Sequence, residues 1–186
     1  NDYDQDGFLN WYEYQAGTDI NDANSYPPIH FGLQGIWTLK EMNGSRAIDF
    51  SENSNHAELR IDQNTSSSYL EIPHIENYES DRGTVSMWVN FESLEGKQGL
   101  LSKDAKGLVD GGHFAIYLFD GNLSARLQSA KRIHAMSYSA GSETGTWYRI
   151  AFSWVENGMK LHVNGHLVAS DSYDGGLGKS SGGLGN

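Results

Sequence analysis

The chain of 186 residues contains no cysteine and only three prolines. Disulfide bridges and thiolate metal sites are therefore excluded. No apolar run approaches the roughly 20 residues that span a bilayer, so we expect no membrane insertion. The formal net charge is −11 and no stripe of basic residues is present. This charge argues against nucleic acid as a partner, because nothing would neutralise its phosphates.

The chain also lacks an initiating methionine and a signal-like leader, so we expect a mature or excised piece of a larger protein, with other domains as neighbours. Glycine and aromatic residues, in contrast, are abundant: 22 Gly, 10 Tyr, 7 Phe and 5 Trp. Many glycines and few prolines indicate many tight turns, which favours an all-β chain with one substantial core.

The N-terminal segment 1–25 is acidic and has no lysine or arginine. It contains the pattern D-x-D-x-D-G-x-x-x-x-x-E, with Gly7 at the sixth position, where a calcium loop turns sharply. Calcium takes six to eight oxygen ligands. The expected set is Asp2, Asp4, Asp6, the backbone carbonyl of Phe8, Asn10 through water, and Glu13 as the bidentate closing ligand. A solvated acidic tail is the alternative, but the matching glycine and glutamate favour calcium.

A short helix is expected from Leu9 to Tyr14, and Gly17 is placed to end it. The stretch LNWYEYQAGTDINDANS resembles the calcium-binding repeats of bacterial exported proteins, which are related to thrombospondin type 3 and dockerin repeats. Because such repeats usually occur in tandem, the resemblance implies that Asp19, Asn21 and Asp22 contribute oxygens to a shared site.

After a stiff linker at residues 26–29, which contains two prolines, extended segments follow at nearly regular spacing. The sequence predicts a β-sandwich domain over residues 30–186. Asn164-Gly165 and Asp120-Gly121 are pairs that suit a two-residue type I′ hairpin, and Glu156-Asn157-Gly158 suggests a turn one residue longer. The expected strands are Leu33–Lys40, Ala47–Asp49, Ala57–Ile61, Tyr69–Ile72, Thr84–Phe91, Gly99–Lys103, His113–Phe119, Leu123–Gln128, Ile133–Ser139, and a meander over 145–170.

The motifs GIWTLKEMNGSRAIDFSENSNHAEL, SYLEIP, GTVSMWVNF, GTWYRIAFSW and KLHVNGHLVAS occur in an order that resembles laminin-G-like, concanavalin A-like lectin domains. The resemblance implies a jelly-roll of two antiparallel sheets, in which ligands bind a concave sheet or the rim loops. The family usually continues through further strands, whereas this chain ends in GGLGKSSGGLGN, so we expect the C-terminal strands to be missing.

Three weaker sites were considered. Asp49, Ser51, Asn53 and Asn55 place oxygens at alternate positions and suit a second calcium ion, but they equally suit a turn held by their own backbone. Asp104 and Asp110 lie in a glycine-rich rim loop, either for ligand contact or as a plain connector. Core packing is the first expectation for each of Trp37, Trp88, Trp147 and Trp154. If one of them stacks on a sugar, Trp88 is the tryptophan expected to face a concave groove, with Arg126 and Gln128 on the same surface.

No paired-carboxylate strand motif, zinc motif or nucleophile elbow is present, so catalysis is not expected. We therefore expect a non-catalytic, calcium-associated module of an exported or cell-surface bacterial protein that binds a polysaccharide or surface glycan. The alternatives are a structural or adhesion spacer without a small ligand and an accessory module of a polysaccharide-degrading enzyme. An exposed aromatic among Trp37, Trp88 and Tyr138 would favour binding over spacing.

Overall fold

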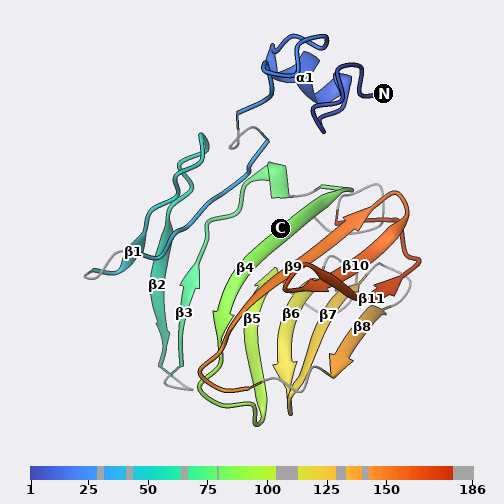
Figure 1. Ribbon diagram of the computed structural model, residues 1–186. Coiled ribbons are helices and arrows are strands. Elements are labelled where there is room, and N and C mark those ends of the chain that lie inside the picture. The colour runs from blue at the N-terminus through green and yellow to red at the C-terminus, as the bar shows by residue number, and fades with distance from the viewer. Residues whose placement is uncertain are drawn as a thin grey trace. The chain divides into compact units, whose positions relative to one another are not determined.

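The computed structural model describes residues 1–28, 32–40, 44–63, 67–78, 80–103, 113–128, 133–139 and 143–177 (Figure 1). The chain divides into two compact units, Asn1–Pro73 and His74–Asn186. The boundary expected at residues 26–29 stays a prediction. No helix among the described residues is long and apolar enough to cross a membrane.

The first unit contains the helix α1 (Asn10–Ala16) and a three-stranded antiparallel sheet. The helix ends as expected, because Gly17 adopts the left-handed conformation with φ of 73° and its N–H caps the last turn. The sheet has the order β1-β2-β3, with strands β1 (Arg46–Ala47), β2 (Ala57–Asp62) and β3 (Ser67–Glu71).

The strand expected over Leu33–Lys40 is not formed, and this prediction was wrong. Within residues 32–40 the structure has a single isolated bridge, between Trp37 and Asp49. Leu39 has a φ of 52°, in the left-handed region, which interrupts an extended strand. Trp37 instead donates a hydrogen bond from its ring Nε1 to the carbonyl of Asn55 at 3.1 Å.

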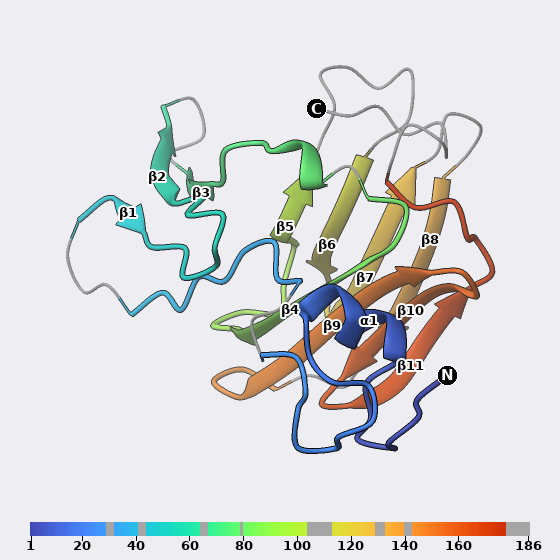
Figure 2. The ribbon, with the colours of Figure 1, turned by 90° about the horizontal axis from the view of Figure 1, so that it is seen from above.

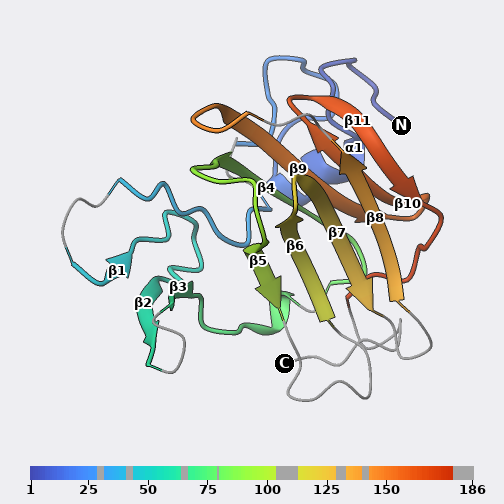
Figure 3. The ribbon, with the colours of Figure 1, turned by 90° about the horizontal axis from the view of Figure 1, so that it is seen from below.

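The second unit is a sandwich of two four-stranded antiparallel sheets preceded by a short 3-10 helix, Glu76–Tyr78. One sheet has the order β11-β10-β9-β4 and the other the order β5-β6-β7-β8. Figures 2 and 3 show these sheets as two layers. The strands are β4 (Gly83–Asn90), β5 (Lys97–Lys103), β6 (His113–Phe119), β7 (Asn122–Gln128), β8 (Ile133–Ser139), β9 (Trp147–Val155), β10 (Gly158–Val163) and β11 (His166–Asp171).

The core lies between these two sheets and is built from alternate residues of each strand, as a period of two requires. Phe114 on β6 meets Phe152 and Trp154 on β9, with ring centroids 5.3 and 5.7 Å apart. Phe152 is fully buried and Trp154 is 6% exposed. The all-β sandwich expected from the sequence is confirmed, with β9, β10 and β11 forming the expected meander.

The hairpin turns follow their local sequence. Asn164 and Gly165 have φ of 51° and 84°, and Asp120 and Gly121 have 46° and 77°, as type I′ turns require. The third turn differs from the expectation, because Val155 pairs directly with Gly158 and only two residues lie between the strands. Gly158 is required there, since its φ is 101° and a Cβ would lie 2.3 Å from a backbone oxygen.

Candidate functional site

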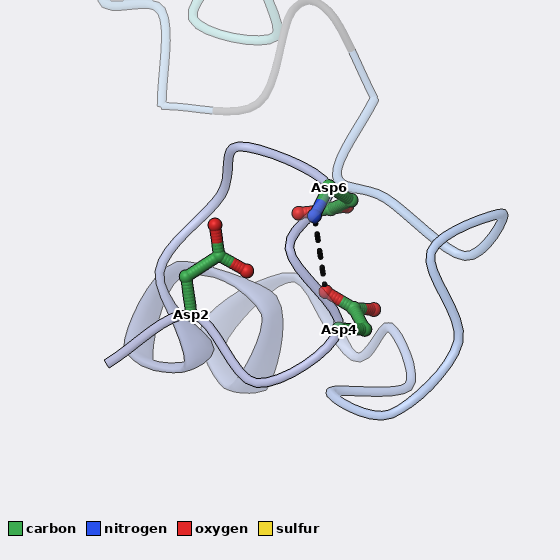
Figure 4. Close-up of side chains that lie close together, drawn as sticks. All are labelled: Asp2, Asp4 and Asp6. Atoms are coloured by element: carbon green, nitrogen blue, oxygen red, sulfur yellow. Dashed lines mark hydrogen bonds between the residues drawn. The ribbon is translucent and has the colours of Figure 1, made fainter.

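The acidic loop brings three carboxylates together. One oxygen from each of Asp2, Asp4 and Asp6 lies within 4.8 Å of the others, and Figure 4 shows the three side chains converging on the inside of the loop. Part of this arrangement is held by the loop backbone: the N–H of Gln5 donates to Asp2 Oδ1 at 2.8 Å, and the N–H of Phe8 donates to Asp6 Oδ1 at 2.8 Å. Alternate carboxylates therefore point inward although they repel one another.

Glu13 closes this loop from the first turn of α1. Its side chain is fully buried, and neither of its carboxylate oxygens accepts a hydrogen bond from any residue that the structure describes. The Oδ2 atoms of Asp4 and Asp6 are buried without a partner in the same way. The pKa of Glu13 is raised, first by burial and then by the negative charges of the neighbouring aspartates, Asp4 foremost. Buried unpaired carboxylates are costly unless a cation compensates them.

This donor set fits calcium. The acidic loop offers four carboxylates, Asp2, Asp4, Asp6 and Glu13, at the first, third, fifth and twelfth positions of the motif, and hard oxygen ligands are what calcium prefers. Gly7, at the sixth position, has a φ of 99°, which a side-chain-bearing residue rarely adopts. Asn10 uses its Oδ1 to accept the N–H of Tyr3 at 2.9 Å.

The segment after the helix forms turns of its own. Asp19 Oδ1 accepts the N–H of Asn21 at 3.1 Å, and Asp22 Oδ1 accepts the N–H of Asn24 at 3.0 Å. The hydrogen bonds from Asn24 lower the pKa of Asp22. A contribution of this segment to a shared calcium site remains a prediction.

Asp49 anchors the loop for which a second calcium ion was considered. Its carboxylate is 3% exposed and accepts four hydrogen bonds. Oδ1 accepts the N–H groups of Ile36 and Ser51 at 2.8 and 2.9 Å. Oδ2 accepts the Ser51 hydroxyl and the Asn55 N–H, each at 2.8 Å. These contacts favour the turn interpretation over a second calcium ion at Asp49, Ser51, Asn53 and Asn55.

We expect Asp49→Asn to destabilise the protein by at least about 2 kcal/mol near neutral pH, because charged acceptors contribute about 1.5–3 kcal/mol per hydrogen bond. Burial raises the pKa of Asp49, but its hydrogen bonds outweigh burial and hold the pKa below its ordinary value. This stabilisation is present above the unfolded pKa and is lost as pH falls through the lower folded pKa. The melting temperatures of the parent chain and of Asp49→Asn should therefore approach each other progressively as pH falls below about 4. Glu52→Gln is the control, because Glu52 lies in the same loop but is exposed. A stability difference between Asp49→Asn and the parent chain that persists at low pH would contradict the charge argument.

The outer face of β4 and β9 carries two exposed tryptophans, and we call Trp88, Asn90, Trp147 and Arg149 the tryptophan face. Trp88 is 65% and Trp147 is 61% exposed. Trp88 pairs with Arg149, and Asn90 pairs with Trp147, so all four side chains share one side of the sheet. Such diagonal neighbours lie roughly 7–8 Å apart, within reach of two aromatic rings. The face offers flat apolar area beside polar groups.

Core packing, the first expectation for each strand tryptophan, was therefore wrong for both Trp88 and Trp147. Trp88 faces outward, as the sugar-stacking hypothesis requires, and the groove expected there stays a prediction. Trp37 is partly buried, and Tyr138 packs against the core. The signal for Trp147 and Arg149 was present in the sequence, because Tyr148, Ile150, Phe152 and Trp154 alternate as the buried set and leave the odd-numbered residues of β9 on the other side.

Arg126 and Gln128 do not lie on the tryptophan face, which corrects the shared surface expected from the sequence. They project from β7 on the outer side of the other sheet. Ala125 and Leu127, which directly precede Arg126 and Gln128 on this strand, are in the core, so the alternate residues point outward. Outer faces of two packed sheets point in opposite directions. Asp104 and Asp110 lie outside the described residues.

A family model matches residues 62–184, and its description is the concanavalin A-like lectin/glucanases superfamily. The match covers most of the sandwich, and the chain belongs to this superfamily. No curated protein matches the chain.

Several solved structures are similar to this chain at low sequence identity. The binding domain of botulinum neurotoxin serotype D has a TM-score of 0.53 and 16% identity, over 71% of this chain and 37% of that one. Its ligand-binding domain in complex with N-acetylneuraminic acid gives 0.50 and 17%, over the same shares. The CBM40 of a Ruminococcus gnavus sialidase, bound to α2,3-sialyllactose, gives 0.46 and 18%, over 54% of this chain and 59% of that one. The chain thus spans well under two thirds of each of these structures.

Proposed function

We propose that the chain is a non-catalytic carbohydrate-binding module of an exported or cell-surface protein, and that a calcium ion stiffens its N-terminal loop. The observation that carries the proposal is the tryptophan face. Trp88 and Trp147 stand exposed side by side although either would gain free energy from burial in the core. Exposed aromatic groups beside polar groups are typical of binding surfaces. A spacer without a ligand has no need of them.

The absence of catalysis in this proposal rests on the distribution of carboxylates. The strands of the two four-stranded sheets carry a single acidic residue, Asp171. A glycosidase needs two carboxyl groups across the scissile bond. The sandwich surface is therefore better suited to holding a sugar than to cleaving it.

The calcium part of the proposal rests on Glu13. Glu13 is fully buried, accepts no hydrogen bond from the residues that the structure describes, and lies close enough to Asp2, Asp4 and Asp6 for their charges to raise its pKa. A divalent cation bound in the loop would compensate this carboxylate. The ion would be held by Asp2, Asp4, Asp6 and Glu13, with the Phe8 carbonyl and the Asn10 side chain completing the set. Its role in the proposal is to order the loop; it takes no part in sugar chemistry.

Trp88→Ala and Trp147→Ala are expected to weaken glycan binding at least about tenfold each, since buried interface tryptophans commonly contribute more than 1–2 kcal/mol. Because both side chains are exposed in the free protein, the melting temperature should change little. A glycan array with the whole chain, including sialylated probes, should identify the ligand, and titration calorimetry should then measure affinity.

Tyr69→Ala is the matched control, because Tyr69 is an aromatic residue 53% exposed on β3 of the other unit. It should leave affinity unchanged. If no glycan binds the intact chain, or if the tryptophan variants bind as well as the parent, the tryptophan face is not a sugar site and the spacer alternative gains.

A further inference from the structure

The strands of the sheet β5-β6-β7-β8 contain no aspartate or glutamate. Their lysines and arginine are Lys97, Lys103 and Arg126; Lys103 pairs with the core residue Phe114, so Lys97 and Arg126 are the two on the outer side. The whole chain, in contrast, has 24 acidic residues against 13 lysines and arginines. An acid-free sheet in such a chain is a local positive surface on a negative protein.

Arg126 lies on the outer side of this sheet with its guanidinium poorly compensated. Its Nη2 donates to Gln128 Oε1 at 2.9 Å, but its Nε is buried and has no hydrogen-bond partner among the residues that the structure describes. No described carboxylate forms an ion pair with it. A guanidinium has five N–H donors, and desolvating it without an acceptor costs free energy.

The side chains on either side of Arg126 are short. On the two flanking strands its register partners are Ala115 and Ala135, which have the shortest side chains after glycine. The neighbouring row of residues on the same outer side consists of Tyr117, Ser124 and Ser137, which carry hydroxyl groups. Lys97 sits over the Tyr117 ring, 5.1 Å from its centroid. We call this outer surface of β6, β7 and β8 the arginine face.

We propose that the arginine face binds the anionic group of an acidic glycan, a sugar carboxylate or a sugar sulfate, with Arg126 as the residue that recognises the anion. Guanidinium is weakly hydrated and matches two oxygens of an oxyanion with two parallel hydrogen bonds. The inference rests on carbohydrate binding as the proposed function, but it assigns a second face on the opposite side of the sandwich.

The test compares Arg126→Gln with the matched control Arg46→Gln, which removes an exposed arginine on β1 of the other unit, outside both faces. The probes are polygalacturonate for carboxylates, dextran sulfate for sulfates and dextran as the neutral polymer, each titrated against the whole chain. We expect Arg126→Gln to weaken binding of one acidic polymer at least tenfold, and Arg46→Gln to leave that affinity within about twofold. Binding should also weaken as salt is raised.

Arg126→Lys keeps the charge and loses the paired donors, so an intermediate affinity is expected if the fork geometry matters. It also keeps the test decisive if the glutamine variant folds poorly, and circular dichroism would check both variants. The carboxylate and sulfate arms tell which anion the face accepts.

Each outcome separates this inference from the proposed function. If acidic polymers bind but Arg126→Gln has no effect, the arginine face is wrong while carbohydrate binding stands. The same holds if the chain binds only neutral glycans through the tryptophan face. If neither the array nor these polymers give any binding, both proposals fall.

Discussion

Calcium is expected to raise the melting temperature of the protein, and Glu13→Gln is expected to abolish most of that rise. Ligand bound only to the folded state stabilises it by mass action, by about 2.7 kcal/mol at a hundredfold excess over the dissociation constant. Calcium sites of extracellular modules have dissociation constants of roughly 10⁻⁴ to 10⁻³ M, so a hundredfold excess corresponds to about 10 to 100 mM calcium. Melts with calcium and with a chelator would measure the difference.

The same variant should behave differently without calcium. Glutamine removes a buried charge that receives no hydrogen bond from the described part of the chain and that is repelled by neighbouring aspartates. In chelator, therefore, Glu13→Gln should be at least as stable as the parent chain, since an unpaired buried charge is more costly than an amide. A simple structural role for Glu13 predicts the opposite, a loss of stability in both conditions.

Glu52→Gln is the matched control for charge, because Glu52 is acidic, exposed and outside residues 1–25. It should keep the calcium response. Asp22→Asn tests the shared site predicted for the segment after the helix: a reduced calcium response would support that site, and a full response would confine the site to the acidic loop. Identical melts of the parent chain with and without chelator would remove the calcium proposal.

Phe152→Ala is expected to destabilise the sandwich by about 3–5 kcal/mol, the range for truncating a buried phenylalanine. Phe152 is fully buried and packs against Phe114 of the other sheet and Trp154 of its own strand. Its removal deletes contacts on both sides of the core and leaves a cavity between the sheets. The melting temperature should fall by more than about 10 °C, because each kcal/mol is worth several degrees in a domain of this size.

Two further variants make this prediction specific. Phe152→Leu keeps most of the volume and should cost under about half as much. Ser153→Ala, the next residue on the outer side of β9, should change stability by less than about 0.5 kcal/mol. Similar losses for Phe152→Ala and Ser153→Ala would contradict the placement of the core.

The sequence was sufficient wherever local chemistry decides the structure. Asn164-Gly165 and Asp120-Gly121 adopt positive φ at little cost, so these hairpins and the alternation of β9 and β10 were predictable. The spacing of the acidic loop likewise predicted that Asp2, Asp4, Asp6 and Glu13 would converge. One oxygen from each of the three aspartates lies within 4.8 Å of the others, and Glu13 is not part of that group. Each of these features depends on residues within about a dozen positions of one another.

The tertiary structure decided what depends on distant pairing. Residues 83–90 pair with residues 147–154, which lie far away along the sequence. Only this pairing brings Trp88 beside Trp147. The assignment of β4 and β7 to different sheets separates Trp88 from Arg126, although both alternate outward in sequence. Asp49 draws one of its four donors from Ile36, 13 residues away. Periodicity tells which residues share a side of one strand, but the choice of partner strand depends on global packing and loop closure, which no local pattern contains.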